Sequence, residues 1–183
     1  MISRWLEALD LPTKEKATIW LPFPLDCPTV KKTVRQDMHD SIQKKINLAA
    51  PIDRVWSALT DFEQFGTWFR AEISGPFVVG AVLRGVATSQ EQECVAWTLE
   101  VTKLEPEHLF AFTWQDEVGP AQRETEPATS VTFRLDPIST GTRLVIAETG
   151  FAALSDKNRI DMFKENTNGW NEQAQNLAAY VEA

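Results

Sequence analysis

Residues 155–181 read SDKNRIDMFKENTNGWNEQAQNLAAYV, and this stretch decides the fold of the chain. Apolar or small side chains recur at intervals of three and four from Ile160 to Val181, and no proline interrupts them. That periodicity predicts one long helix with a single apolar stripe. Asp156 and Asp161 lie near its expected N-terminal end, where negative charge complements the helix dipole. The stripe needs an apolar surface to cover, and the rest of the chain must supply it.

The region before this helix supplies such a surface, because apolar residues alternate with polar ones along several segments. Alternation with a period of two places every second side chain on one face of a sheet. Short connections between the segments predict antiparallel hairpins joined in a meander. The predicted strands are Ser41–Leu48, Arg70–Ile73, Phe77–Val79, Val82–Thr88, Cys94–Leu104, Leu109–Gln115, Thr129–Asp136 and Thr142–Thr149.

Two short helices are predicted between the first strand and the second. The first covers Ile52–Ala58, where the apolar residues fall on one face. Thr60 or Asp61 can cap the second, which runs through Phe65. Gly66 is expected to end it. The predicted order is therefore one strand, two short helices, a meander and a long terminal helix.

The first 40 residues follow a different pattern and are predicted to form an N-terminal appendage, with residues 41–183 as the domain. Several prolines keep this part extended or looped. Trp5, Trp20 and Phe23 would be costly to leave in water. We therefore expect the appendage to pack on the domain or on a second copy of the chain.

Composition excludes several classes of function. The formal net charge of −8 opposes binding to nucleic acid or to an anionic membrane. No run is long and apolar enough to span a bilayer, and a cytoplasmic location is expected. Cys27 and Cys94 are expected to be reduced thiols. His39 and His108 are the only histidines, and without a metal-binding motif no metal site is predicted.

The phrases that follow this order are AAPIDRVWSALTD (49–61), FGTWF (65–69), VVGAVLRG (78–85), KLEPEHLFAFTW (103–114), GTRLVIAETGF (141–151) and GW (169–170). In order and spacing they resemble the START-like superfamily, also called SRPBCC or Bet v-like. Within it, the chain resembles the family related to the activator of the heat-shock-protein-90 ATPase. Gly80-Ala81 departs from the glycine pair usual at that position, so the conformation of the local turn is not predicted.

The resemblance implies an α+β helix-grip fold, in which a curved antiparallel sheet is closed by the terminal helix over a mostly apolar cavity. Cavities of this superfamily bind lipids, sterols, polyketides and plant hormones, and a minority of members catalyse cyclisation or hydrolysis. No cofactor is implied. The leading hypothesis is the binding of a small hydrophobic or amphipathic ligand.

Two alternatives of other classes stay open. In the first, the chain is a partner of a heat-shock chaperone ATPase, as the family name suggests. In the second, it is an enzyme of the polyketide cyclase or hydrolase kind that uses Glu148. Whether any reaction is catalysed is not decided by the sequence. A nucleophile with its base and orienting group cannot be assembled from the residue pattern.

Aromatic residues are the candidate cavity wall, although aromatics at sheet and helix spacing also form plain cores. Asn166 lies on the inner side of the predicted helix and could give an amide contact, whereas Asn171 is expected to be exposed. The candidate ligand-binding residues are Trp68, Phe69, Trp97, Phe112, Trp114, Phe133, Glu148, Phe163, Asn166 and Trp170.

Glu148 is the most informative candidate, because strand parity places it on the apolar face with Leu144 and Ile146. A carboxylate there is costly unless it is paired. One interpretation is a hydrogen bond to a ligand or an acid–base role. The other is a structural tie to a backbone amide, an arginine or the Trp170 indole, or a position at a strand end in water.

Overall fold

The structure, a computed structural model, describes residues 40–88, 96–117 and 126–183. Seven strands form one antiparallel sheet with the order β1-β7-β6-β5-β4-β3-β2. The strands are β1 (Ser41–Leu48), β2 (Ala71–Ile73), β3 (Val82–Ala87), β4 (Ala96–Glu105), β5 (Leu109–Asp116), β6 (Thr129–Ile138) and β7 (Gly141–Thr149). The helices are α1 (Ile52–Thr60), α2 (Phe62–Phe69) and α3 (Asp156–Val181), with a 3-10 turn η1 (Phe151–Ala153) before α3.

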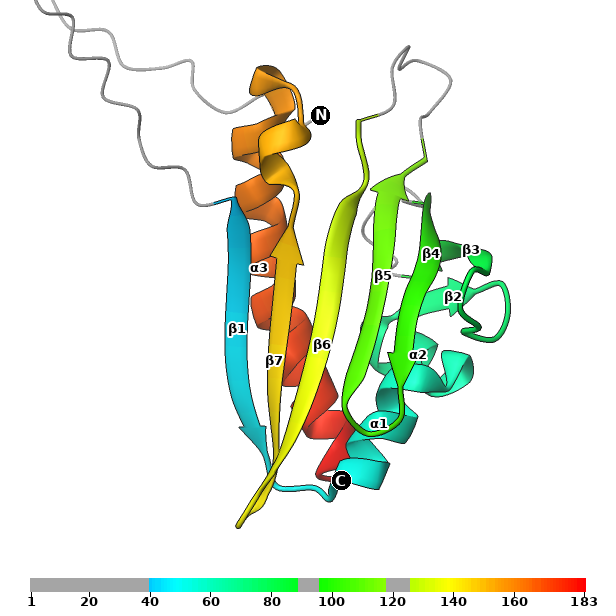
Figure 1. The fold of residues 1–183 in the computed structure, drawn as a ribbon, viewed down its shortest axis with the longest axis vertical. Helices are drawn as coiled ribbons and strands as arrows, with labels where there is room; N and C mark the ends of the chain where they lie inside the picture. Colours follow the sequence, from blue (N-terminus) through cyan, green and yellow to red (C-terminus); the bar gives the residue numbers. More distant parts are fainter. Residues whose placement is uncertain (1–39, 89–95, 118–125) are drawn as a thin grey trace, which may run out of the picture. The chain divides into compact units, whose positions relative to one another are not determined.

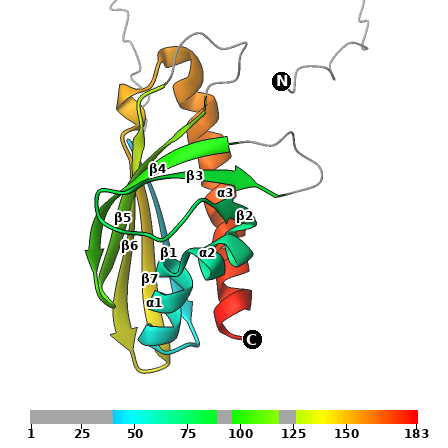
Figure 2. The same cartoon turned by 90° about the vertical axis from the view of Figure 1, so that its right-hand side faces the viewer.

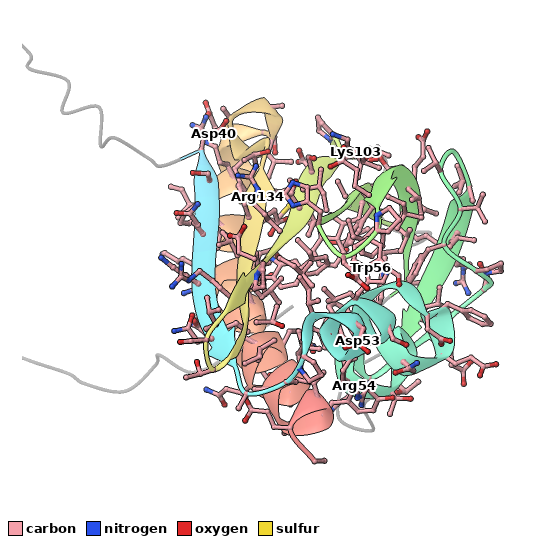
Figure 3. All side chains as sticks on the ribbon, turned by 60° about the horizontal axis from the view of Figure 1, so that its bottom comes forward. Asp40, Asp53, Arg54, Trp56, Lys103 and Arg134 are labelled. Atoms are coloured by element: carbon pink, nitrogen blue, oxygen red, sulfur yellow. The ribbon has the colours of Figure 1, made fainter. Side chains whose placement is uncertain are left out.

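This architecture confirms the predicted meander and the helix-grip fold class. Strands β2 to β7 pair in sequence order, and β1 returns to pair with β7. All three helices lie on one face of the curved sheet, and α3 runs along that face (Figures 1 and 2). The inward apolar side chains of the strands and the apolar side chains of α3 from Met162 to Val181 pack in one core, whereas Ile160 is exposed. The other face of the sheet carries exposed residues such as Lys103 and Arg134 (Figure 3).

Helix α2 is longer than predicted, and Gly66 lies inside it. Asp61 caps the helix as expected, because its side chain accepts hydrogen bonds from the backbone N–H groups of Glu63 and Gln64, both at 3.0 Å. The helix ends only at Arg70, whose φ of 60° is left-handed. Gly66 does not end the helix. It allows α2 to lie close to Ala71, since a Cβ at position 66 would lie 2.4 Å from the carbonyl oxygen of Ala71.

The predicted strand at Phe77–Val79 is wrong, because this segment has no regular structure. Phe77 is buried against the rings of Phe65 and Phe110, whereas Val78 and Val79 are exposed. Pro76 lacks an N–H, so it cannot donate to a strand ladder. Beyond these residues the chain turns at Gly80, with φ of 83°, and its backbone N–H donates to Val101.

Both ends of α3 are held by side chains from elsewhere in the domain. At the N-terminal end the carboxylate of Glu126 accepts hydrogen bonds from the hydroxyl and backbone N–H of Ser155 and from the amide of Asn158. These bonds, the hydroxyl first, hold the pKa of Glu126 below its usual value. At the other end Arg54 of α1, labelled in Figure 3, donates to the carbonyl of Tyr180 at 3.0 Å.

Several predictions concern residues that the structure does not describe. They include the N-terminal appendage up to residue 39, the thiols of Cys27 and Cys94, and His39. His108 lies in the β4–β5 turn and is exposed. Among the described helices, none is both long and apolar enough to cross a membrane.

We predict that Gly66→Ala destabilises the domain by about 1–3 kcal/mol, because the added methyl group forces α2 away from Ala71. Gly169→Ala in α3 is the matched control, since nothing lies within 4 Å of the Cβ that it adds. The control should stabilise the fold by about 0.4–1 kcal/mol. Urea unfolding measures both, and equal midpoints for the two variants would contradict the close-approach role of Gly66.

Candidate functional site

Glu148 lies near the end of β7, on the inner face of the sheet. Its neighbours across the sheet are Ile42 of β1 and Val131 of β6, both buried. The side chain itself is fully buried, at 0% exposure. A carboxylate in such an apolar position is destabilising unless hydrogen bonds replace its lost hydration. The carboxylate must therefore find its partners within the protein.

Four side chains donate to this carboxylate. Trp114 Nε1, Thr129 Oγ1 and Asn166 Nδ2 donate to Oε1, at 2.9, 2.6 and 2.9 Å. Trp170 Nε1 donates to Oε2 at 2.7 Å. Trp114 also shares its N–H with Thr129 Oγ1 at 2.8 Å. The donors come from β5, β6 and α3, so one carboxylate ties three strands to the helix.

The spacing along α3 explains why the helix supplies two donors. Asn166 and Trp170 are four residues apart, which places them on one face of the helix, one above the other. Thr129 is the first residue of β6 and has the same parity as Val131 and Phe133, so its hydroxyl also points inward. Within the described residues, no lysine, arginine or histidine forms an ion pair with Glu148. The charge of this carboxylate is balanced by hydrogen-bond donors alone.

This arrangement matches the structural interpretation of Glu148. A carboxylate offers about four lone-pair sites, and indole and amide N–H groups can only donate. Oε1 accepts three of the four hydrogen bonds and Oε2 accepts one, and Trp170 is the indole that the structural alternative named. Together the four donors hold the carboxylate in one orientation. The geometry favours a fixed, positioning role for the carboxylate.

The rings predicted as a cavity wall form one connected aromatic network around this carboxylate. Trp114 lies 5.6 Å from Trp170 and 6.3 Å from Phe69, measured between ring centroids. Through such contacts the network joins the predicted residues Trp68, Phe69, Trp97, Phe112, Trp114, Phe133 and Trp170. Phe163 differs, because its ring lies against Phe151 of η1, with the ring centroids 5.1 Å apart.

Burial divides the ten predicted residues into two groups. One group is buried in the core: Trp68, Trp97, Phe112, Phe133, Glu148 and Trp170. The other group keeps part of its surface exposed: Phe69, Trp114, Phe163 and Asn166. Asn171 is exposed, as expected. Only the second group retains solvent-accessible surface with which to meet a ligand directly.

Sequence reasoning missed Thr129, which donates the shortest hydrogen bond to Glu148. The parity of β6 could have found it, because Thr129 precedes Val131 and Phe133 by even intervals. Threonine at a strand start is too common to single out on its own. Its partner comes from another strand, and that pairing appears only in the folded sheet.

Asp116, at the end of β5, adds a further carboxyl group beside the network. Partial burial raises its pKa above the usual value, and the negative charges of Glu165 and Glu148 raise it further. Glu165 belongs to α3 and Glu148 to β7, so acidic groups from three elements gather at this end of the layer. An anionic ligand group would be repelled here.

Two open grooves lie in the described part of the chain, and neither is lined by any of the ten predicted residues. One, of about 550 Å³, runs along α2 and β2 and includes Thr67 and Arg70. The other, of about 660 Å³, lies between β1 and α3. In the described ranges no group of three or more histidine, cysteine, aspartate or glutamate side chains is arranged to hold a metal ion.

Comparison with known proteins identifies relatives of this fold. A family model described as "Activator of Hsp90 ATPase homolog 1-like protein" matches residues 49–182. Among curated proteins, none matches the chain.

Solved structures match over most of the domain. Ms6760 from Mycobacterium smegmatis is 18% identical with a TM-score of 0.67, over 79% of this chain and 91% of its own. A protein from Arthrobacter aurescens is 19% identical with a TM-score of 0.65, over 78% of this chain and 86% of its own. DynU16, from the dynemicin biosynthetic locus, is 24% identical with a TM-score of 0.61, over 79% of this chain and 48% of its own. At these identities the matches establish the shared fold.

We predict that Glu148→Gln destabilises the domain by about 1.5–3 kcal/mol, because the amide NH₂ that replaces one oxygen must face a buried donor. If the amide oxygen accepts from Trp114 and Asn166, the NH₂ group meets the Trp170 indole. Glu100→Gln, on the exposed part of β4, is the control and should change stability by less than about 0.5 kcal/mol. Equal unfolding midpoints in urea would show that the four hydrogen bonds contribute nothing.

We predict that Asp116→Asn stabilises the domain at pH 7. A raised pKa means that the folded state holds the proton of Asp116 more tightly than the unfolded state. Stability therefore falls as the pH rises from the usual aspartate value of 3.8 through the raised folded value, and the asparagine variant escapes this loss. Thermal unfolding should show a higher Tm for the variant at pH 7 and a shrinking difference as the pH approaches 3.8. A Tm difference between Asp116→Asn and the unchanged chain that does not depend on pH would contradict the electrostatic cause.

Proposed function

Because the chain belongs to the activator of Hsp90 ATPase homolog 1-like family, we propose that it binds a small apolar or amphipathic ligand between its sheet and α3. The superfamily resemblance implies a mostly apolar cavity at this place. The proposal assigns the ligand to the end of the layer where β5 and the N-terminal half of α3 face one another. The partly exposed residues Phe69, Trp114, Phe163 and Asn166 mark that end.

The uneven burial of the aromatic network is the observation that carries the proposal. Phe112, Phe133 and Trp170 are buried against their neighbours and leave no surface for a ligand. Trp114 and Phe69 belong to the same network but remain partly exposed, as does Phe163 on α3. Apolar rings left partly in water at one end of a core favour an apolar guest that covers them.

Asn166 and Trp114 supply the polar end of this site. Both donate to the same oxygen of Glu148, so the carboxylate fixes the orientation of the two side chains. The amide oxygen of Asn166 accepts no hydrogen bond from the described residues, which leaves it available to a hydroxyl or amine of the ligand. In this proposal Glu148 is a positioning residue. The enzyme alternative that used Glu148 as acid or base gains no support, since the carboxylate is fully buried and is held in place by four hydrogen bonds.

The chaperone alternative remains a prediction drawn from the family description. It needs a surface that meets a partner, and it makes no use of the aromatic network or of Asn166. Saturable uptake of a small molecule at the network therefore separates the two hypotheses.

The test is titration of the full chain with Nile red, a neutral apolar dye whose fluorescence rises out of water. We expect saturable one-to-one binding, and Phe163→Ser should weaken it by about tenfold, because burial of an aromatic ring is lost. Trp114→Phe should also weaken binding, since it removes the indole that meets Glu148.

Trp56→Phe is the matched control, because Trp56 is a partly exposed tryptophan of α1 that lies outside the network. It should bind the dye like the unchanged chain. Circular dichroism must show the same helix content in all variants. Dye uptake without saturation, or equal affinities for Phe163→Ser and Trp56→Phe, would reject the proposed site.

A further inference from the structure

Within the described residues, strand β1 presents a free edge that the proposed ligand site does not use. It is the first strand in the sheet order, and among the described strands it pairs only with β7. Eight residues pair in unbroken register from Ser41 to Leu48, without a bulge. The edge strand at the other end of the sheet, β2, has only three residues. Natural proteins shorten, distort or charge exposed edges to prevent further pairing, and of these devices β1 shows only charge, at Lys44 and Lys45.

The unpaired side of β1 carries a row of backbone groups. In an antiparallel pair, only alternate residues direct their N–H and C=O groups toward the partner strand. The remaining groups of β1 point outward, and within the described residues no backbone or side-chain hydrogen bond reaches them. An added strand would satisfy these groups.

A groove lies beside this edge, open to solvent, with a volume of about 660 Å³. One wall is β1 from Lys44 to Leu48, and the other is a stripe of α3 at intervals of three and four residues. The stripe consists of Asn171, Ala174, Gln175 and Ala178. The two alanines have small side chains that leave space in the groove, and the side-chain amides of Asn171 and Gln175 can form hydrogen bonds with a peptide.

The charge of the edge differs from that of the whole protein. The chain has a formal net charge of −8, whereas the sequence of β1, SIQKKINL, contains two lysines and no acidic residue. A second copy is a poor partner, because two antiparallel β1 strands paired about their centre would place Lys44 opposite Lys45 of the other copy. Like charges directly opposite one another are destabilising, and opposite charges are stabilising.

We propose that the free edge of β1 and the adjoining groove bind an extended acidic segment of a partner protein, which adds to the sheet as an outer strand. Lys44 has the parity of Ile42 and Ile46 and faces the groove, while Lys45 is exposed on the other face. Neighbouring residues of the added strand also face opposite sides. Two consecutive acidic residues therefore match the two lysines.

The test uses the full chain labelled with ¹⁵N and three capped eight-residue peptides of valine and threonine. Their central pairs are Glu-Asp, Gln-Asn and Lys-Lys. We expect the acidic peptide to shift the amide signals of residues 41–48 and 171–178 in a saturable manner. The neutral peptide should bind about fivefold more weakly, and the basic peptide more weakly still.

A charge-reversed variant makes the test specific. Lys44→Glu combined with Lys45→Glu should lose the preference for the acidic peptide and gain one for the basic peptide. Lys164→Glu changes a lysine of α3 outside the groove and should leave the order of the three peptides unchanged. This binding should also weaken with added salt.

The proposal would be overturned by the absence of saturable shifts at millimolar peptide, by equal affinity for all three peptides, or by slow hydrogen exchange of every β1 amide in the free chain. The last result would mean that the edge is already covered. Shifts confined to Phe69, Trp114 and Phe163 would place the peptide at the ligand site and would also overturn it. The dye titration described above is independent of β1, so the two proposals can fail separately.

Discussion

The burial of one carboxylate, that of Glu148, constrains the arrangement of the sheet and α3. Its four hydrogen bonds fix the middle of α3 against the last three strands of the meander. Replacing the hydration of a buried carboxylate requires several donors at once, and here they are two indoles, an amide and a hydroxyl. A small rotation or shift of α3 would remove Asn166 and Trp170 together, because they share one face. The hydrophobic effect brings the sheet and α3 together, and the hydrogen bonds of the carboxylate favour one position of the helix along the sheet.

The same network explains why the aromatic layer has both a closed part and an open part. Below the carboxylate, Phe112, Phe133 and Trp170 contact one another and fill the space between sheet and helix. Trp114 is held by its indole N–H, so its ring stays at the boundary and remains partly exposed. A boundary of this kind, with oriented polar groups beside apolar rings, is suited to recognition of an amphipathic molecule.

Charge distinguishes the two surfaces that the fold offers. Around Glu148 the neighbouring Asp116 and Glu165 make the end of the layer acidic, which disfavours an anionic guest. Strand β1 carries two lysines, one on each face, and no acidic residue, on a protein with a net charge of −8. The ligands proposed for the two surfaces therefore differ in charge and size, a small molecule for the first and a peptide strand for the second.

Most of the fold was predictable from local patterns. Alternation in β1 and β7 indicated their inward faces, although Lys44 and Glu148 share the inward parity, and the spacing of residues 160–181 at intervals of three and four predicted α3 as one helix. The segment Phe77–Val79 shows the limit of such patterns. Three apolar residues suggest a strand, but only Phe77 finds a place in the core, and Val78 and Val79 remain exposed. Gly66 shows the same limit, since its role depends on the distant approach of Ala71.

The sequence by itself determined the order of the elements, the inward position of Glu148 and the aromatic character of the layer, because these follow from the spacing of side chains along each element. Only the tertiary structure decided which groups meet. It brought Thr129 to Glu148, divided the aromatic residues into buried and partly exposed groups, and left the edge of β1 beside a groove. Hydrogen bonds between elements and the closeness of packing depend on distances in three dimensions, and no pattern along one chain segment contains them.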